Sequence, residues 1–210
     1  MKIFSKQLLL SSSGTGSIEY TTPGTYTFNI QKPTRARIAI VGAGQPSEDH
    51  RSSASGSTPY SYAGAGGAAF VGVVVLKKGL YTVVVGDATK SDWKVIPPGP
   101  IPLDWTLYMK EANAYDSLLI RNEETLIKAG AVRLANVQQY GNGYTDNNLV
   151  VSENLVIAQT IIASDGNDGG GMGYTNNHKP GGASLYQGWG QGAETYVENY
   201  TKGYFKLEYI

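Results

Sequence analysis

The chain has 210 residues, among them 27 glycines and no cysteine, and 17 basic residues balance 17 acidic ones. A nucleic-acid binder normally carries a basic stripe, so this zero balance argues against nucleic acid as a partner. Without cysteine, disulfides, thiolate nucleophiles and cysteine-based metal sites are excluded. No apolar run approaches the roughly 18 residues of a membrane span, and a Ser-Ser-Ser-Gly sequence ends the short leucine run near the start. We therefore expect neither membrane insertion nor a signal peptide.

The first part of the chain predicts a series of strands. A short strand is expected at residues 17–20, before a Pro-Gly turn at residues 22–25. Residues 26–30 alternate large apolar and polar side chains with a period of two, as a half-buried strand does. Residues 36–41 end in a continuous apolar run, which suits a central strand covered on both faces.

Two further strands are expected at residues 69–76 and 80–85. The Lys-Lys-Gly tripeptide between them predicts a hairpin turn by its composition and spacing. Residues 45–67, which precede these strands, are rich in Ser, Gly, Ala and Pro and show no period. We interpret them as a long loop.

The second part of the chain alternates apolar runs with breaks. Four prolines between 97 and 102 predict a loop over residues 90–105. Apolar runs at 117–120 and 125–129 flank Arg-Asn-Glu-Glu, which predicts a second hairpin. Residues 131–140 have the spacing of a short helix.

The last part predicts strands around a glycine-rich tract. Two apolar runs lie within residues 149–163, and glycine dominates residues 165–192. The closing residues 203–210 alternate as a strand, and their Phe and Leu indicate that this strand is paired inside a sheet.

These elements predict an all-β fold, a single-domain sandwich or jelly roll with glycine-rich loop excursions. Residues 17–210 form the glycine-rich β domain, and residues 1–16 are an N-terminal arm or a first strand. Glycine tracts bury little apolar surface and lose much entropy on ordering. They must therefore be either disordered or packed backbone to backbone, as extended helices of the polyproline II type can be.

Three local patterns suggest a cofactor or metal and fail on inspection. Gly42-Ala43-Gly44 follows a strand as in a dinucleotide-binding turn, but Ser47 replaces the third glycine and no amphipathic helix follows. Asp165 and Asp168 lie among glycines as in a calcium-binding β-roll, but without its repeat. His178 lies in a polar loop as a surface residue. No cofactor and no metal site are predicted.

Acidic residues offer a weak option for catalysis. A pair of carboxylates can hydrolyse a glycosidic bond, but spacing in a β fold does not indicate which of them lie close together. The acidic residues in question are Asp104, Glu111, Asp116, Glu123 and Glu124. No Gly-x-Ser-x-Gly elbow marks a catalytic serine. No catalytic residue is predicted.

Aromatic side chains in the glycine- and serine-rich segments are the predicted ligand-binding residues. A rigid ring offers contact area at low entropic cost, and a sugar can stack its C–H face on it. The predicted residues are Tyr60, Tyr62, Tyr174, Tyr186 and Trp189.

The order of these parts resembles a known family. A Gly-Thr-Tyr-Thr-Phe strand at 24–28, the strand that ends in Gly-Ala-Gly at 44, the glycine cluster at 64–67, Pro180-Gly181-Gly182 and the closing Gly-Tyr-Phe-Lys-Leu carry the resemblance. They are similar to the glycine-rich domain of bacteriophage tail-fibre and tail-tip adhesin proteins. The resemblance covers roughly residues 18–210, although residues 87–116 and 131–163 resemble additions to it.

The resemblance implies a non-enzymatic phage or prophage structural protein that contacts the host surface, a glycan or a protein, through its loops. It implies a place in the virion tail fibre after synthesis in the bacterial cytoplasm, in a homotrimer or with other fibre subunits. Two alternatives stay open. One is a cell-surface or secreted bacterial carbohydrate-binding module, and the other is a glycan-cleaving enzyme.

Overall fold

The computed structural model describes most of the chain as strands and extended segments. The described residues are 7–8, 16–53, 59–95, 106–110, 112–131, 149–165, 172–174, 190–191, 193–194 and 200–210. Every regular element among them is a strand, which confirms the all-β prediction. The same residues contain no helix that is long and apolar enough to cross a membrane.

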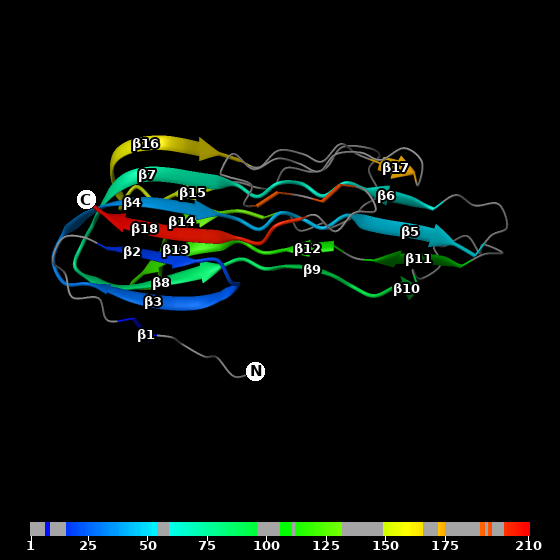
Figure 1. Cartoon of the computed structure of the whole chain (residues 1–210), viewed down its shortest axis with the longest axis horizontal. Coiled ribbons are helices and arrows are strands. Elements are labelled where there is room, and N and C mark those ends of the chain that lie inside the picture. Colours follow the sequence, from blue (N-terminus) through cyan, green and yellow to red (C-terminus); the bar gives the residue numbers. More distant parts are fainter. Residues whose placement is uncertain are drawn as a thin grey trace.

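Two large sheets pack face to face as a sandwich, which we call the body (Figure 1). The six-stranded body sheet comprises, in spatial order, β1 (Gln7–Leu8), β3 (Gly24–Ile30), β8 (Gly79–Val85), β13 (Ser117–Arg121), β14 (Glu124–Ala129) and β15 (Leu149–Val151). The five-stranded body sheet comprises β16 (Val156–Ser164), β7 (Ala69–Leu76), β4 (Thr34–Val41), β18 (Tyr204–Tyr209) and β2 (Ser17–Tyr20). Neighbouring strands are antiparallel, except that β1 runs parallel to β3.

Two smaller sheets lie beyond one end of the body (Figure 1). The distal sheet comprises, in spatial order, β10 (Lys94–Val95), β11 (Leu107–Lys110), β5 (Glu48–Ser52), β6 (Tyr60–Tyr62) and β17 (Met172–Tyr174). Between it and the body lies a ribbon of β12 (Ala112–Ala114) and β9 (Ala88–Lys90).

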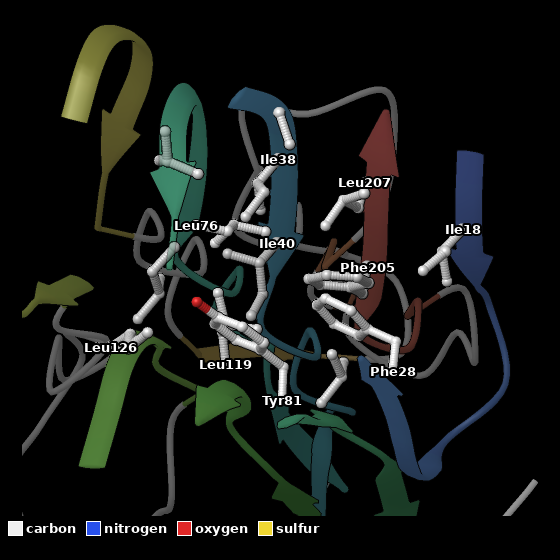
Figure 2. Packing of buried hydrophobic residues seen from close by; sticks show 14 of the residues in the cluster. Ile18, Phe28, Ile38, Ile40, Leu76, Tyr81, Leu119, Leu126, Phe205 and Leu207 are labelled. Carbon is white, nitrogen blue, oxygen red and sulfur yellow. The ribbon is translucent and has the colours of Figure 1, made fainter. Parts of the chain in front are cut away.

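The body core is built by the alternation that the sequence shows. Phe28 and Ile30 of β3 point inward, as do Phe205 and Leu207 of β18, and all four are almost fully buried. The Phe28 ring stacks on Tyr81 with 5.2 Å between centroids, and Phe205 lies 6.1 Å from Phe28 (Figure 2). Phe205 also stacks on Tyr20 at 6.0 Å. Burying one such side chain contributes roughly 1.5–3 kcal/mol, so this core holds the sandwich together.

One of the two predicted hairpins is confirmed. β13 and β14 pair around Asn122 and Glu123, whose φ angles are 50° and 66°. Two positive φ angles in a two-residue loop are the signature of a type I′ turn, which matches the right-handed twist of the strands.

The other predicted hairpin, at residues 77–79, is wrong. β7 pairs with β4 and β16, whereas β8 pairs with β3 and β13. The chain therefore crosses here from one sheet of the sandwich to the other. The composition of a turn does not distinguish such a crossing from a hairpin, because both need only a sharp reversal.

All excursions of the chain begin and end at one end of the body. The chain leaves the body after β4, β8, β14 and β16 and returns at β7, β13, β15 and β18. Register places these ends together, since Val41 lies opposite both Ala69 and Tyr204. Extended segments lead from this end to the distal sheet (Figure 1). We call them the stem; the described stem residues are 42–47, 63–68, 86–87, 115–116, 130–131, 190–191, 193–194 and 200–203.

Hydrogen bonds between backbones hold the stem together. The amides of Gly42 and Gln45 donate to the carbonyls of Ala68 and Ala65, at 2.9 and 2.8 Å. The amide of Gly44 turns instead to the carbonyl of Thr201, at 2.8 Å. Gly42 and Gln45, three residues apart, thus donate to the same neighbouring segment. This three-residue period is the pattern of three-fold extended helices that lie side by side.

A second pair of stem segments repeats this three-residue spacing. Gly64 and Gly67 donate to the carbonyls of Ala193 and Gly190, at 2.8 and 2.7 Å. Of the two outcomes that the glycine tracts allow, the described segments show packing of backbone against backbone.

Close approach requires glycine in the stem. A Cβ atom on Gly44 would overlap the carbonyl of Gln191, and one on Gly64 would overlap the carbonyl of Gln45. The other small stem residues include buried alanines such as Ala43 and Ala68. The stem therefore has almost no side-chain core.

Two predicted loops contain strands, and one segment with helical spacing lies outside the described residues. Residues 45–67 are not one long loop, because β5 and β6 form within them. Residues 90–105 were also predicted as a loop, yet Lys94–Val95 form β10, while the prolines lie outside the described residues. The residues with helical spacing, 131–140, lie outside the described part of the chain after Ala131.

Candidate functional site

The distal sheet joins segments that are far apart in the sequence. β5 and β6 come from the first excursion, β10 and β11 from the second, and β17 from the last. β5 lies in the middle, with Asp49 opposite Ser61 on one side and opposite Lys110 on the other. Because side chains of a strand alternate, Glu48 and His50 belong to one face and Asp49 and Arg51 to the other.

A buried contact between His50 and Glu48, covered by tyrosines, forms the first face. His50 Nε2 lies 2.6 Å from Glu48 Oε1, and both side chains are buried. The imidazole stacks on Tyr60 with 4.8 Å between centroids and meets the edge of Tyr62 at 5.6 Å. Polar residues can thus form a strand here because their side chains contact each other and are covered by rings. The composition of residues 45–67 does not show these contacts, and for this reason it predicted a loop.

Three of the five predicted binding residues lie in the distal sheet. Tyr60 and Tyr62 lie half-buried in β6, not at a loop tip. Tyr174 lies in β17 directly opposite Tyr60 in the register. Tyr186 and Trp189 lie outside the described residues, so their role stays a prediction.

A second buried network ties the opposite face to the stem. Lys90 Nζ of β9 lies 2.7 Å from Asp49 Oδ2, and Ser61 Oγ donates to Asp49 Oδ1 at 2.8 Å. Lys90 Nζ also donates to Ser47 Oγ at 2.9 Å. Charges this deeply buried are stable only with such partners, so the network fixes the distal sheet on the ribbon below it.

Four residues further along this face form a cluster of rings and cations. The guanidinium carbon of Arg51 lies 4.2 Å from the ring centroid of Trp93 and 5.2 Å from that of Tyr108. Lys110 Nζ lies 5.4 Å from the Trp93 centroid. Arg51 is exposed, and the other three are half-buried. We call these four residues the cationic face.

The sequence does not reveal the cationic face. Its members come from different strands and a loop, and only the pairing of β5 with β11 sets Arg51 opposite Tyr108. The alternation of Leu107, Tyr108, Met109 and Lys110 was the available signal for one of these strands.

The described residues offer no metal cluster of three or more His, Cys, Asp or Glu side chains. Asp165 accepts a hydrogen bond from the Leu149 amide at 2.7 Å, while Asp168 and His178 lie outside the described residues. Gly42 and Gly44 of the dinucleotide-like sequence pack against stem carbonyls, so backbone occupies the space where a pyrophosphate would have to approach.

The acidic residues do not assemble into one described site. Next to the stem, Asp116 Oδ1 accepts a hydrogen bond from the Ala131 amide at 2.9 Å, and Asp116 Oδ2 lies 3.3 Å from Lys128 Nζ. Glu123 and Glu124 lie at the β13–β14 turn, at the other end of the same strands. Asp104 and Glu111 lie outside the described residues.

A small cavity of about 220 Å³ lies at that turn, on the end of the body away from the stem. Glu124 Oε1 accepts hydrogen bonds from Ser152 Oγ at 2.6 Å and Asn154 Nδ2 at 2.8 Å, and these bonds hold the pKa of Glu124 below its usual value. Arg121 Nη2 donates to the Lys78 carbonyl at 2.8 Å. These polar groups are engaged in joining loops, so the cavity serves the fold.

Comparison with models of known protein families finds no match for the chain, and comparison with curated protein sequences finds none either.

Proposed function

We propose that the chain is a non-enzymatic structural protein of a phage or prophage virion, a tail-fibre tip or adhesin that contacts the host surface with its distal sheet. One observation carries the proposal. The excursions leave one end of the body, and their described parts pack into a stem whose far end displays a small sheet built from distant segments.

Such a stem suits recognition at a distance. Hydrogen-bonded backbones in close contact at glycines give a rigid spacer, and a preorganised tip loses little entropy when it binds. The order of strands and glycine tracts, which resembles phage tail-fibre adhesins, supports the same proposal. In this function the chain acts in the virion, alone, as a homotrimer or with other fibre subunits, and its partner is a host glycan or protein.

Binding of the labelled, purified chain to a panel of bacterial strains, measured by flow cytometry, tests the proposal. We expect saturable binding to some strains, and unlabelled chain should compete for it. Tyr60→Ser with Tyr62→Ser should reduce binding, because these tyrosines cover the His50–Glu48 pair of the distal sheet. Leu80→Ser, at an exposed position of the body, is the matched control and should bind normally.

Alanine at Tyr186 or Trp189 extends the test to residues outside the described part of the chain. Absence of saturable binding to every strain of the panel would contradict the adhesin proposal.

A carbohydrate-binding module is the second candidate, favoured by the rings and cations of the cationic face. Neighbouring genes separate the two candidates. Genes for virion assembly beside this one favour the phage protein, and genes for secreted glycan-degrading enzymes favour the module.

A further inference from the structure

The cationic face contains positive charge that the described residues do not neutralise. The buried Lys90 nearby has its own carboxylate, Asp49, and the buried His50 side chain contacts Glu48. No such ion pair joins Arg51 or Lys110 to a carboxylate in the described part of the chain. The exposed carboxylate of Asp92, next to Trp93 in the sequence, offsets only one of these two cations, so the described residues of the face keep a net positive charge.

Arg51 is exposed, and its guanidinium N–H groups form no hydrogen bond or ion pair within the described part of the chain. A guanidinium that lies against rings uses its flat face, whereas its N–H groups point along the edge and fit a carboxylate or phosphate in a bidentate manner. Contact with Trp93 and Tyr108 also holds the long side chain in place before a ligand arrives. Less rotamer entropy is then lost on binding.

Apolar surface lies beside this charge. Val95 is 58% exposed and lies opposite Tyr108 in the register of β10 and β11. The pairing of Tyr108 with both Arg51 and Val95 puts a cation, a ring and an aliphatic side chain side by side on one face. An acidic sugar fits this combination, since its C–H groups pack on apolar surface while its anionic group meets the cation.

We propose that the cationic face binds an acidic saccharide, a sugar unit that carries a carboxylate or a phosphate, with Arg51 and Lys110 holding the anionic group. The proposal rests on the proposed function and names the ligand class of its distal sheet. A nucleic acid fits the face less well, because two cations on a chain of zero net charge do not follow a phosphate backbone.

An oligosaccharide array tests the proposal. Uronic-acid- and sialic-acid-terminated glycans are printed beside their carboxyl-reduced neutral counterparts, and sugar phosphates beside their dephosphorylated forms. We expect binding to the acidic member of at least one pair and not to its neutral counterpart. The carboxylate and phosphate arms distinguish the two possible anionic groups.

Variants then assign the binding to the face. Arg51→Gln should weaken it by about 10- to 100-fold, because a charge-assisted bidentate contact is lost. Lys110→Gln should have a smaller effect, and Trp93→Ala should weaken binding by releasing the Arg51 side chain. Lys32→Gln removes an exposed cation from the other end of the body and should bind as the unaltered chain does. Thermal unfolding of each variant checks that the distal sheet stays folded.

Three outcomes would overturn the proposal. Equal binding to acidic and neutral partners would do so, as would acidic binding that folded Arg51→Gln retains in full. Loss of cell binding after protease treatment of the cells, with no binding on the array, would assign the surface to a protein receptor instead. In that last case the adhesin function survives, whereas absence of both cell and array binding contradicts the proposed function itself.

Discussion

The body and the stem of this molecule are held together in opposite ways. In the body, Phe28, Phe205 and Leu119 meet between two sheets, and their burial supplies the stabilisation. In the stem, the amides of Gly44 and Gly64 donate hydrogen bonds to carbonyls of other segments, and more than half of the described residues are glycine or alanine. A substitution that removes side-chain volume therefore harms the body, whereas one that adds volume harms the stem.

The same contrast assigns stability of the fold and recognition of a ligand to different parts of the molecule. The body can keep its sheets while the residues at the far end of the stem vary, because the stem is joined through hydrogen bonds between backbones and through close contacts at glycines. The distal sheet depends instead on paired charges such as Asp49 with Lys90. The predictions below test each kind of stabilisation.

The largest effect is expected for Gly64→Ala. The added Cβ would overlap the backbone carbonyl of Gln45, which cannot move without breaking stem hydrogen bonds. We expect a loss of more than about 4 kcal/mol in the free energy of unfolding of the stem. Hydrogen exchange should show deprotected stem amides while body strands stay protected.

Gly16→Ala is its control, since a Cβ there would lie 3.9 Å from the nearest atom, Tyr209 Cδ2. A stem that tolerates alanine at Gly64 as well as the body tolerates it at Gly16 would contradict packing of backbone against backbone.

Phe205→Ala should destabilise the body by about 3–5 kcal/mol, because it leaves a cavity beside Phe28 and Tyr20. Chemical denaturation measures this loss. Leu80→Ala, at a side chain that is 53% exposed, should change the free energy of unfolding by no more than about 0.5 kcal/mol. Similar losses for the two variants would disprove the assignment of the core.

Asp49→Ala should cost about 3 kcal/mol, since it leaves the Lys90 ammonium buried without its carboxylate. Adding Lys90→Met to Asp49→Ala should recover much of this loss. A double-mutant cycle from urea unfolding gives the coupling between the two residues. Strictly additive losses would show that the pair does not hold the distal sheet to the ribbon.

Glu123→Gly should stabilise the body by about 1 kcal/mol, because glycine adopts the φ of 66° at this position without the cost that a side chain incurs. An increase in melting temperature measures the gain. Glu153→Gly, in the polar turn before β16, has no positive φ to relieve and should not stabilise the chain. No gain at Glu123 would argue against the type I′ turn.

The smallest effect concerns pH. Hydrogen bonds from Ser152 and Asn154 lower the pKa of Glu124, so the stability that they contribute is present above the pKa of the unfolded chain. This stability is lost as the pH falls through the lower pKa of the folded chain. In Ser152→Ala, NMR titration should show the pKa of Glu124 rising toward its usual value. Thr25→Ala, on a distant strand, should leave it unchanged, and an unaltered titration in Ser152→Ala would reject the cause.

The strands of the body were largely predictable because their signals are local. Alternation marked residues 26–30 and the closing strand, and a polar tetrapeptide between apolar runs marked the β13–β14 turn. The turn at 77–79 was assigned to the wrong partner strands, since pairing depends on which faces become buried and not on the turn itself.

The distal sheet was largely unpredictable for the same reason. β5 is a strand of Glu48, Asp49, His50, Arg51 and Ser52, and no apolar alternation marks it. Burial of its polar side chains is stable only with partners from other segments: Lys90 and Ser61 contact Asp49, and Tyr60 stacks on His50. Tyr60 and Tyr62 were singled out from composition, whereas the cationic face required the register of β5 with β11.

The sequence by itself determined an all-β body and tracts poor in side chains that had to be disordered or packed through their backbones. Both conclusions follow from local chemistry: period-two burial and the missing Cβ of glycine. Only the tertiary structure decided that all excursions leave one end of the body, that the described tracts bond to each other in the stem, and that Arg51 meets Trp93 and Tyr108. These contacts join residues far apart in the chain, and the free energy that selects them exists only when the partners are together.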